Sequence, residues 1–325
     1  MYSSLEECVN SLLNGGLAVL PSETVYGLAA VATDSNAVCK IYKLKGRPPS
    51  NPLIVHVLDL DMAKKVVHLS SLAEKIISCF WPGPLTLVLN KKKIVPSIVT
   101  AGLETVAIRA PSHPLFRKVL RKVNAPLAAP SANPSNAVSP TTANHVFHAF
   151  GDSCPPTLDG GLCDYGLEST VLDLSTHIPK ILRPGPISNA LIKKRIKIEL
   201  AESTFTGQNS GKPSKSPGSS SRHYSPKTPL HIYENIDELK KVKLNELTDL
   251  VLCIDKKNAN FFEKKRIETL CFSEDGDPRD IAQNFYLTLQ NEDKIGKKRI
   301  IAHLIEKDIE IANAVNDRLK RASSN

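Results

Sequence analysis

The segment "KGRPPSNPLIVH" (45–56) places two cations and a histidine on a stiff piece of chain. Proline fixes its own φ angle and biases the preceding residue toward an extended conformation, so this loop loses little freedom when a ligand binds. If the local backbone is extended, Lys45 and Arg47 can both reach one anionic group. His56 ends the apolar strand that follows and would project at the edge of a cleft. The stretch would suit a ligand with several negative charges, but by itself it favours the alternative, an ordinary basic turn with a packed histidine.

A second loop, "APSANPSNAVSPTT" (129–142), follows the apolar strand "PLAA" and supplies small hydroxyl and amide groups. The polar candidates in it are Ser131, Asn133, Ser135, Asn136 and Ser139. Such groups reach a phosphate or a ribose at short range without the cost of desolvating a charge. In the alternative reading, the same side chains only satisfy the local backbone of a turn.

Two further clusters also lie at the ends of predicted strands. The segment "SETVYGLA" (22–29) contains Gly27, where backbone can pass close to a ligand. The segments "YGLESTVLDL" and "ILRPGPIS" (165–188) offer Ser169 and Arg183. None of the clusters is a Walker loop, a dinucleotide-binding glycine motif or a nucleophile elbow, and none has the spacing of a metal site.

The composition is that of a basic globular protein. The chain has 325 residues, a hydrophobic fraction of 41% and a net charge of +9, which suits a polyanion or merely a well-solvated surface. No run approaches the ~18 apolar residues of a membrane span, and the early positive charge of a leader is missing. The seven cysteines include no C-x-x-C pair, which favours reduced thiols over a disulfide scaffold or a zinc knuckle. We expect a soluble, cytoplasmic protein without a protein-ligated metal.

The elements that must position the candidate residues mix helices with strands. The segment "SLEECVNSLLNGG" predicts a first helix with Ser4 and Glu7 as its capping box. Short β-rich segments bounded by Gly, Pro, Ser or Asn predict the strands "LAVLP", "VYGLAAVA", "PLIVHV", "LTLVLN", "TVAIRAP", "PLAAPS", "STVLDL" and "KILRPG". Further helices are predicted near 36–44, 60–79, 113–123 and 141–149. Because the two kinds of element do not alternate strictly, residues 1–200 are predicted to form an α+β domain with a mixed sheet.

The composition changes after this first domain. Residues 201–229 are rich in Ser, Pro and Gly and lack apolar periodicity, which predicts a linker. From residue 230 the strands "LHIY" and "LVLCI" and two amphipathic helices follow. Residues 230–325 are therefore predicted to form a second, smaller α/β domain.

Taken in order, these segments resemble the motif series of the YrdC-like L-threonylcarbamoyladenylate synthases. The series is "PSETVYGLA", "KGRPPSNPLIVH", "WPGPLTLVL", "TVAIRAP", "APSANPS", "YGLESTVLDL" and "ILRPGPIS", in register over residues 5–200. The segment "SPGSSSRHYSP" (216–226) further resembles the linker of the longer form of the family. The resemblance implies a twisted mixed sheet of the YrdC-like type, followed by a small Rossmann-like domain.

The resemblance also implies an activity. Enzymes of this family are nucleotidyltransferases that condense L-threonine, bicarbonate and ATP, the ATP accompanied by Mg²⁺, to threonylcarbamoyl-AMP and pyrophosphate. A separate transferase complex then passes the threonylcarbamoyl group to the adenosine beside the anticodon of certain tRNAs. We therefore expect that complex as a downstream partner, and only weak direct binding of tRNA.

Site residues are carried over position by position. The Lys-x-Arg and Ser-x-Asn signature, expected to be catalytic, falls on Lys45, Arg47, Ser131 and Asn133. The threonine side would consist of Thr24, His56, Arg109, Ala129 and Ser169. The nucleotide side would consist of Arg47, Asn51, Thr105, Ser131, Ser139, Arg183 and Tyr224. Three departures from the family pattern stand out: Ser22 replaces the usual threonine, Asn136 stands where glycine is common, and the linker has serines at 219–221 where bulkier residues are common. In the linker, Arg222 and Tyr224 would cover the bound nucleotide.

Two other functions compete with this one. An RNA-binding protein would use the basic concave surface directly, but it would need exposed aromatics among its cations, and aromatics make up only 5% of the chain. A catalytically silent regulatory relative would keep only the fold, whereas the signature at Lys45, Arg47, Ser131 and Asn133 is intact.

Overall fold

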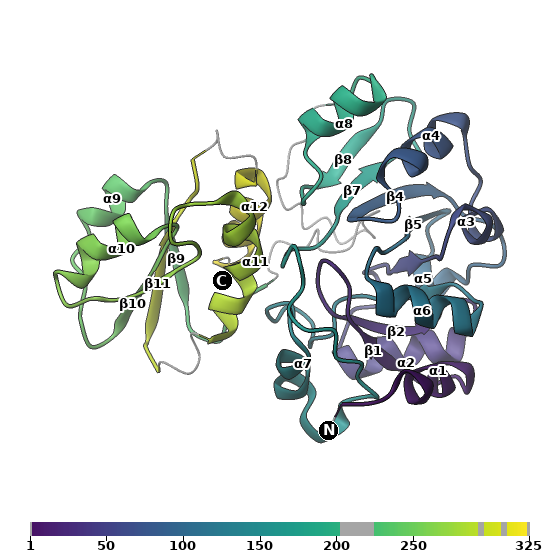
Figure 1. Cartoon of the computed structure of the whole chain (residues 1–325), viewed down its shortest axis with the longest axis horizontal. Helices are drawn as coiled ribbons and strands as arrows, with labels where there is room; N and C mark the ends of the chain where they lie inside the picture. Colours follow the sequence, from purple (N-terminus) through teal and green to yellow (C-terminus); the bar gives the residue numbers. More distant parts are fainter. Residues whose placement is uncertain (1, 202–223, 292–295, 307–310, 324–325) are drawn as a thin grey trace.

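The computed structural model describes residues 2–201, 224–291, 296–306 and 311–323, which form two lobes (Figure 1). The first lobe is built on an eight-stranded sheet in the order β1-β2-β6-β3-β5-β4-β7-β8. Its strands are β1 (Ala18–Leu20), β2 (Gly27–Val31), β3 (Ile54–His56), β4 (Leu85–Asn90), β5 (Thr105–Arg109), β6 (Leu127–Ala128), β7 (Thr170–Asp173) and β8 (Lys180–Arg183). The β3–β5 and β4–β7 pairs are parallel and the other pairs are antiparallel, so the predicted mixed sheet is confirmed.

Helices cover one face of this sheet, and the other face carries the polar residues. The first lobe contains α1 (Leu5–Leu13), α2 (Ser35–Lys45), α3 (Leu60–Val66), α4 (Ser71–Phe80), α5 (Ser97–Thr100), α6 (Pro114–Val123), α7 (Ala143–Phe150), α8 (Asn189–Ile196) and the short 3₁₀ helix Gly151–Ser153. Val55 and Ile108 pack in the main core with α1 to α4 and α6, whereas Ile54 and Ala107 belong to a small apolar cluster apart from it. Since side chains alternate along a strand, His56 shares the face of Ile54, and Arg109 shares that of Ala107.

The predicted first helix is confirmed at the level of its cap. Ser4 accepts a hydrogen bond from the backbone amide of Glu7, and the Glu7 side chain accepts one from the amide of Ser4. The expectation of one helix near 60–79 is wrong, because the chain forms α3 and α4 with a break between them. Val67 in that break pairs with Lys91, and Ser70 caps the start of α4.

The chain around Lys45 also differs from the expectation. Lys45 is the last residue of α2 rather than part of an extended loop, and the helix ends at Gly46, whose φ of 60° lies in the left-handed region that glycine adopts easily. Lys45 and Arg47 therefore leave the chain on either side of a helix terminus.

The second lobe, called the second domain below, is a four-stranded parallel sheet in the order β11-β10-β12-β9. It consists of β9 (Leu230–Tyr233), α9 (Ile236–Lys240), β10 (Asp249–Cys253), α10 (Lys256–Glu263), β11 (Glu268–Cys271), α11 (Pro278–Asn291), β12 (Arg299–His303) and α12 (Ala312–Ala322). The predicted small α/β domain is confirmed, and the structure shows that its sheet is parallel. In the usual Rossmann order the first strand is central, whereas here β9 lies at the edge and β12 separates it from β10.

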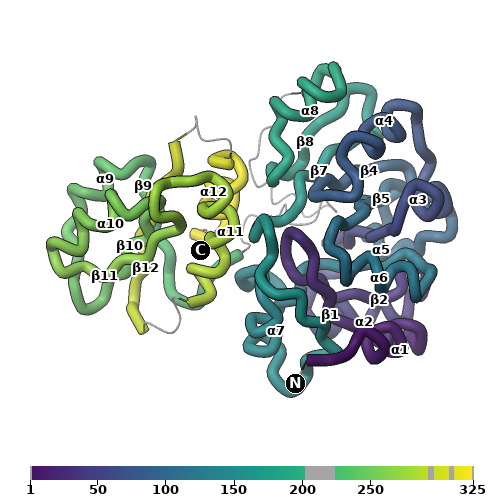
Figure 2. Tube along the Cα trace, in the orientation of Figure 1, coloured from purple at the N-terminus to yellow at the C-terminus, as the bar shows by residue number. Residues whose placement is uncertain are grey.

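The second domain presents two of its helices to the first lobe. Leu250 and Leu252 of β10 pack with α11 and α12, while Val251 and Cys253 point to α9 and α10 on the opposite face. Figures 1 and 2 show α11 and α12 on the side toward the first lobe, with α9 and α10 on the far side. The domain limits 1–200 and 230–325 stay predictions, and most of the predicted linker 201–229 lies outside the described residues.

Candidate active site

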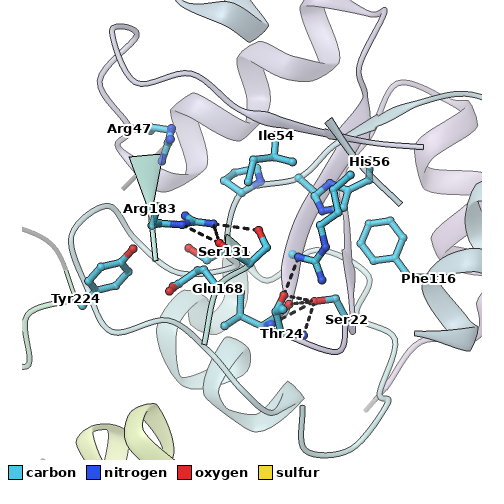
Figure 3. Close-up of a pocket in the computed structure, with 16 residues that line it drawn as sticks. Ser22, Thr24, Arg47, Ile54, His56, Phe116, Ser131, Glu168, Arg183 and Tyr224 are labelled. Atoms are coloured by element: carbon cyan, nitrogen blue, oxygen red, sulfur yellow. Dashed lines mark hydrogen bonds between the residues drawn. The ribbon is translucent and has the colours of Figure 1, made fainter. Parts of the chain in front are cut away.

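A pocket of about 590 Å³, partly open to solvent, gathers residues from strands and loops that are far apart in the sequence (Figure 3). Nine of the residues carried over from the family line it: Thr24, Arg47, His56, Arg109, Ala129, Ser131, Ser169, Arg183 and Tyr224. The remaining five, Lys45, Asn51, Thr105, Asn133 and Ser139, do not appear among the lining residues of this pocket. The sheet topology thus brings most of the predicted residues to one place, while their roles stay predictions.

His56 and Arg109 are neighbours because β3 and β5 run parallel in a register that pairs them. Arg109 makes an ion pair with Glu23 at 2.6 Å (Nη2 to Oε1) and donates hydrogen bonds to the Thr24 hydroxyl at 2.9 Å and the Gly83 carbonyl at 3.1 Å. Burial alone would raise the pKa of Glu23, but the charge and hydrogen bond of Arg109 hold that pKa below its ordinary value. Arg109 is therefore a buried cation that lines the pocket in a fixed orientation.

His56 is held as a neutral imidazole. Its ring stacks on Phe116, with centroids 5.0 Å apart, and the residue is only 4% exposed. Burial, together with the positive charge of Arg109, lowers the pKa of His56 to about 3. A neutral imidazole offers one donor and one acceptor, which suits a ligand hydroxyl better than a ligand charge.

The turn at 22–25 is organised by the Ser22 hydroxyl. That hydroxyl accepts from the amides of Thr24 and Val25 and donates to the Val25 carbonyl at 2.6 Å. It also lies 3.0 Å from the Thr24 hydroxyl. Ser22 thus fixes Thr24 in the pocket. Threonine, the usual residue of the family at position 22, also carries a hydroxyl, so the replacement by serine keeps the group that organises this turn. Gly27, in the same segment, lines the pocket and forms an antiparallel bridge with Ser131.

Arg183 and Ser169 form a second fixed polar group. Arg183 donates to the Ser169 carbonyl from Nε at 3.1 Å and from Nη2 at 2.9 Å, and Nη2 also lies 3.2 Å from the Ser169 hydroxyl. The Ser169 hydroxyl is 2.7 Å from that of Thr86 on β4. Antiparallel pairing of β7 with β8 places the two residues together.

Arg47 is pinned by the turn that follows it. Its guanidinium donates to the Asn51 carbonyl at 3.0 Å, the Asn51 side-chain oxygen at 2.6 Å and the Pro52 carbonyl at 2.7 Å. Burial lowers the pKa of Arg47 to about 10, so the side chain keeps its charge at neutral pH. Asn51 is thus a support for Arg47 in the structure, not a lining residue.

Lys45 has a different place from the one expected for it. Its ammonium donates to the carbonyl of Ser131 at 2.6 Å and to the carbonyl of Asn133, and its own carbonyl accepts from the amide of Ser135. Asn133 in turn donates its side-chain amide to the carbonyls of Pro134 and Ala137. These two residues of the signature hold the 131–137 loop together, rather than line the pocket.

Ser139 leads to a residue that sequence reasoning missed. Its hydroxyl donates to the carboxylate of Glu168 at 2.6 Å, and Glu168 lines the pocket although it is only 7% exposed. Glu168 stands inside the quoted motif "YGLESTVLDL" directly before Ser169, so the motif itself was the available signal. Phe116 was also missed, because nothing in the sequence of α6 indicates that it stacks on His56.

Thr105 and Tyr224 are the two remaining residues of the predicted nucleotide side. Thr105 begins β5, four residues before Arg109, and pairs with Asn90. Tyr224 is 1% exposed and lines the pocket near Arg183 and Glu168 (Figure 3). Arg222, the other predicted lid residue, lies outside the described residues.

Among the described residues there is no group of three or more His, Cys, Asp or Glu side chains that could hold a metal ion. In the same parts of the chain, no helix is both long and apolar enough to cross a membrane.

Comparisons with known proteins agree with this architecture. A family model described as "Telomere recombination", which covers the Sua5, YciO and YrdC proteins, matches residues 10–185, and a model described as "Threonylcarbamoyl-AMP synthase, C-terminal domain" matches 187–324. The threonylcarbamoyl-AMP synthase of Pyrococcus abyssi is 37% identical over 95% of this chain and 91% of its own length. That of Bacillus subtilis is 44% identical over 68% of this chain and 64% of its own length.

A solved structure extends the match to three dimensions. The crystal structure of P. abyssi Sua5 complexed with L-threonine superposes with a TM-score of 0.85 and 33% identity, covering 98% of this chain and 94% of that one. Both lobes are therefore shared with that protein. The chain belongs to the Sua5/YciO/YrdC family, in the form that also carries the C-terminal domain of threonylcarbamoyl-AMP synthases.

Proposed function

We propose that this protein is an L-threonylcarbamoyladenylate synthase, which makes threonylcarbamoyl-AMP and pyrophosphate from L-threonine, bicarbonate and ATP. The observation that carries the proposal is the charge of the pocket. Three buried arginines, Arg47, Arg109 and Arg183, line it, and Glu168 is the only carboxylate among its lining residues in the described chain. Glu23 pairs with Arg109, whereas the hydrogen bonds of Arg47 to Asn51 and Pro52 go to neutral oxygens. The pocket therefore keeps an excess of positive charge, which fits a substrate pair that carries phosphates and a carboxylate.

Threonine would occupy the Arg109 end of the pocket. Arg109 is fixed by Glu23 and Thr24, so it can offer its remaining N–H groups to the amino acid's carboxylate without reorganising. Neutral His56 and the Ser169 hydroxyl would read the threonine side-chain hydroxyl, and Ala129 would face its methyl group. A P. abyssi homologue was solved in complex with L-threonine, which supports threonine as the amino-acid substrate.

ATP would occupy the end formed by Arg47, Ser131 and Arg183, with Tyr224 beside it. The threonine nitrogen first bonds to the bicarbonate carbon with loss of water, which gives a carbamate. A carbamate oxygen then bonds to the α-phosphorus while the bond from that phosphorus to the pyrophosphate oxygen breaks. Arg47 and Arg183 would stabilise the charge that builds on the phosphate oxygens in this step. Lys45 and Asn133 would serve by holding Ser131 in place, and Ser139 by its bond to Glu168.

Mg²⁺ would come bound to the phosphates of ATP. Among the described residues that line the pocket, the one carboxylate, Glu168, already accepts hydrogen bonds from Ser139 and Tyr286, so we propose no protein ligand for the ion. Asn51 and Thr105 belong to the proposed nucleotide side, Asn51 through its hold on Arg47.

The product defines the cellular setting that we propose. A mixed anhydride of a carbamate and AMP hydrolyses readily, so a transferase complex must consume it close to where it is made. We propose that this complex is the tRNA threonylcarbamoyl transferase of the cytoplasm, and that the synthase itself binds tRNA weakly or not at all.

The test is an assay of purified protein with ATP, Mg²⁺, L-threonine and bicarbonate. Pyrophosphate should be released, mass spectrometry should detect threonylcarbamoyl-AMP, and omission of threonine should abolish most of the release. Equal release with and without threonine would exclude the proposed function.

A further inference from the structure

The contact between the two lobes is centred on a buried carboxylate that belongs to the pocket. Glu168 precedes β7 in the first lobe, and α11 and α12 of the second domain pack over it. Its Oε2 atom accepts from the Tyr286 hydroxyl at 2.9 Å and lies 3.3 Å from Nε of Arg318. Tyr286 and Arg318 are both completely buried. Two partners of a pocket residue therefore come from the second domain.

The same carboxylate reaches back into the proposed nucleotide side. Its Oε1 atom accepts from the Ser139 hydroxyl at 2.6 Å and lies 3.2 Å from the Tyr286 hydroxyl. Arg318 also donates from Nη1 to the carbonyl of Pro184 at 2.6 Å, and Pro184 directly follows Arg183. Arg318 thus touches the segment that carries Arg183, and Tyr286 is linked to Ser139 through their shared acceptor, Glu168.

The charges explain why this arrangement matters for an anionic ligand. Burial would raise the pKa of Glu168, but Arg318 and Arg183 hold it below its ordinary value, so the carboxylate is charged. Burial and the neighbouring carboxylate raise the pKa of Tyr286 well above its ordinary value, so its hydroxyl remains a donor. A carboxylate beside a phosphate site repels the ligand and draws cations away from it. Arg318 offsets the charge of this carboxylate, and the hydrogen bonds from Tyr286 and Ser139 fix its direction.

We propose that Glu168 is a positioning residue of the nucleotide side, and that Tyr286 and Arg318 set its direction, so that the ATP site is complete only when the second domain is docked. This inference rests on the proposed function for the identity of the nucleotide. Loss of either partner leaves the carboxylate free to turn toward Arg183 and the phosphates. ATP affinity should fall, while threonine, bound at the Arg109 end, should be affected little.

The variants Tyr286→Phe and Arg318→Met test the proposal in the full-length protein. Tyr286→Phe keeps the shape of the ring, Arg318→Met keeps an unbranched apolar stem, and each removes the contact with Glu168. The matched control is Gln283→Leu, which removes a hydrogen bond from the same helix α11 to the Cys163 carbonyl across the same interface, away from Glu168. Thermal melts show which variants stay folded, and Tyr286→Phe, which loses only one oxygen, keeps the test valid if Arg318→Met unfolds.

Two readings are taken for each protein. Calorimetry measures the Kd of a non-hydrolysable ATP analogue, and the pyrophosphate assay gives KM for ATP and for threonine separately. We expect Tyr286→Phe and Arg318→Met to raise the analogue Kd and the ATP KM about tenfold, equivalent to about 1.4 kcal/mol, with threonine KM within twofold of wild type. Gln283→Leu should change neither constant by more than twofold.

A double-mutant cycle links the effect to Glu168. In a Glu168→Gln background, Tyr286→Phe should add little to the loss of ATP affinity, because the charge that it fixes is gone. The proposal is overturned if the ATP constants are unchanged, if ATP and threonine weaken equally, if Gln283→Leu has the same effect, or if the cycle is additive. The analogue Kd does not require turnover, so failure of the proposed reaction would be visible separately in the wild type.

Discussion

The ammonium group of Lys45 donates a hydrogen bond of 2.6 Å to the carbonyl of Ser131, although 86 residues separate the two. Lys45 is 3% exposed, and burial, with the nearby charge of Arg47, lowers its pKa well below the ordinary value. The end of α2 is thereby tied to the loop that presents Ser131 to the pocket. The two cations of the Lys-x-Arg pair consequently do different things: Lys45 holds a loop, and Arg47 lines the site.

The first prediction concerns Lys45→Met. The substitution leaves the carbonyls of Ser131 and Asn133 without their side-chain donor, so the free energy of unfolding should fall by about 2 kcal/mol. Urea denaturation followed by the fluorescence of Trp81, the only tryptophan, measures this in the first lobe. Lys43→Met, an exposed position on the same helix, is the control and should change the free energy by less than about 0.5 kcal/mol. If Lys45→Met lowers the free energy of unfolding as little as Lys43→Met does, Lys45 does not hold the 131–137 loop in place.

The second prediction concerns Arg47→Ala. If Arg47 stabilises charge on the α-phosphate in the transition state, its removal should cost ~3 kcal/mol, or about a hundredfold in kcat. The fold should survive, as judged by the Trp81 fluorescence and a cooperative melt. Arg47→Lys keeps the positive charge but lacks the planar guanidinium group, so its kcat should lie between those of wild type and Arg47→Ala. Near-normal turnover of Arg47→Ala would show that the assigned role is wrong.

The third prediction concerns pH and His56. The pKa is about 3 in the folded protein and near 6.5 when unfolded, so between these values only the unfolded state binds the proton. This contribution to stability is complete above the unfolded pKa and is lost as the pH falls below it. From pH 7 to 5 the unfolding free energy of wild type should drop by about 2 kcal/mol more than that of His56→Gln.

Urea denaturation at both pH values provides the measurement. The two proteins should show the same pH dependence between pH 7 and 8, which serves as the internal control. Parallel losses down to pH 5 would mean that the folded protein accommodates a protonated His56.

The fourth prediction concerns the choice of amino acid. Valine has the shape of threonine but no hydroxyl, so it would leave His56 and Ser169 without their partner. Its kcat/KM should therefore be at least about a thousandfold lower than that of threonine. Serine, which lacks only the methyl group, should be a weaker but real substrate, and Ser169→Ala should narrow the gap between threonine and valine. Use of valine at the rate of threonine would exclude side-chain reading by these residues.

The fifth prediction concerns Gly166→Ala at the contact between the lobes. Gly166 has a φ of 64°, and a Cβ atom there would lie 2.4 Å from the carbonyl oxygen of Gln283 on α11. Gly161→Ala is the matched control, because its φ of 76° imposes similar backbone strain with no atom within 4 Å of the new Cβ. Both variants should lose about 1 kcal/mol from strain. Only Gly166→Ala should also weaken the packing of the second domain, seen as faster hydrogen exchange in α11 and α12. Equal rates of hydrogen exchange in α11 and α12 of the two variants would show that the contact between the lobes accommodates the new methyl group without loss of stability.

The sequence alone was enough to predict most helices and strands and many of the residues that line the pocket. Capping residues, short β-rich runs and turn residues have local causes, so α1 and all eight strands of the first sheet were predicted. The ordered motifs identified nine of the sixteen residues that line the pocket. The break between α3 and α4 was missed, because the pairing of Val67 with Lys91 is a long-range contact that no local pattern contains.

Only the tertiary structure decided what each site residue touches. Lys45 and Arg47 are two positions apart and both cationic, yet the end of α2 sends one to the carbonyls of a distant loop and the other to the pocket. Glu168 reads in the sequence as an ordinary charged residue beside Ser169. It becomes a buried contact between the two lobes only because α11 and α12 bring Tyr286 and Arg318 to it. These residues lie 118 and 150 positions further along the chain. The energy of a buried charge depends on which groups surround it in space, and the packing of the two lobes determines those groups.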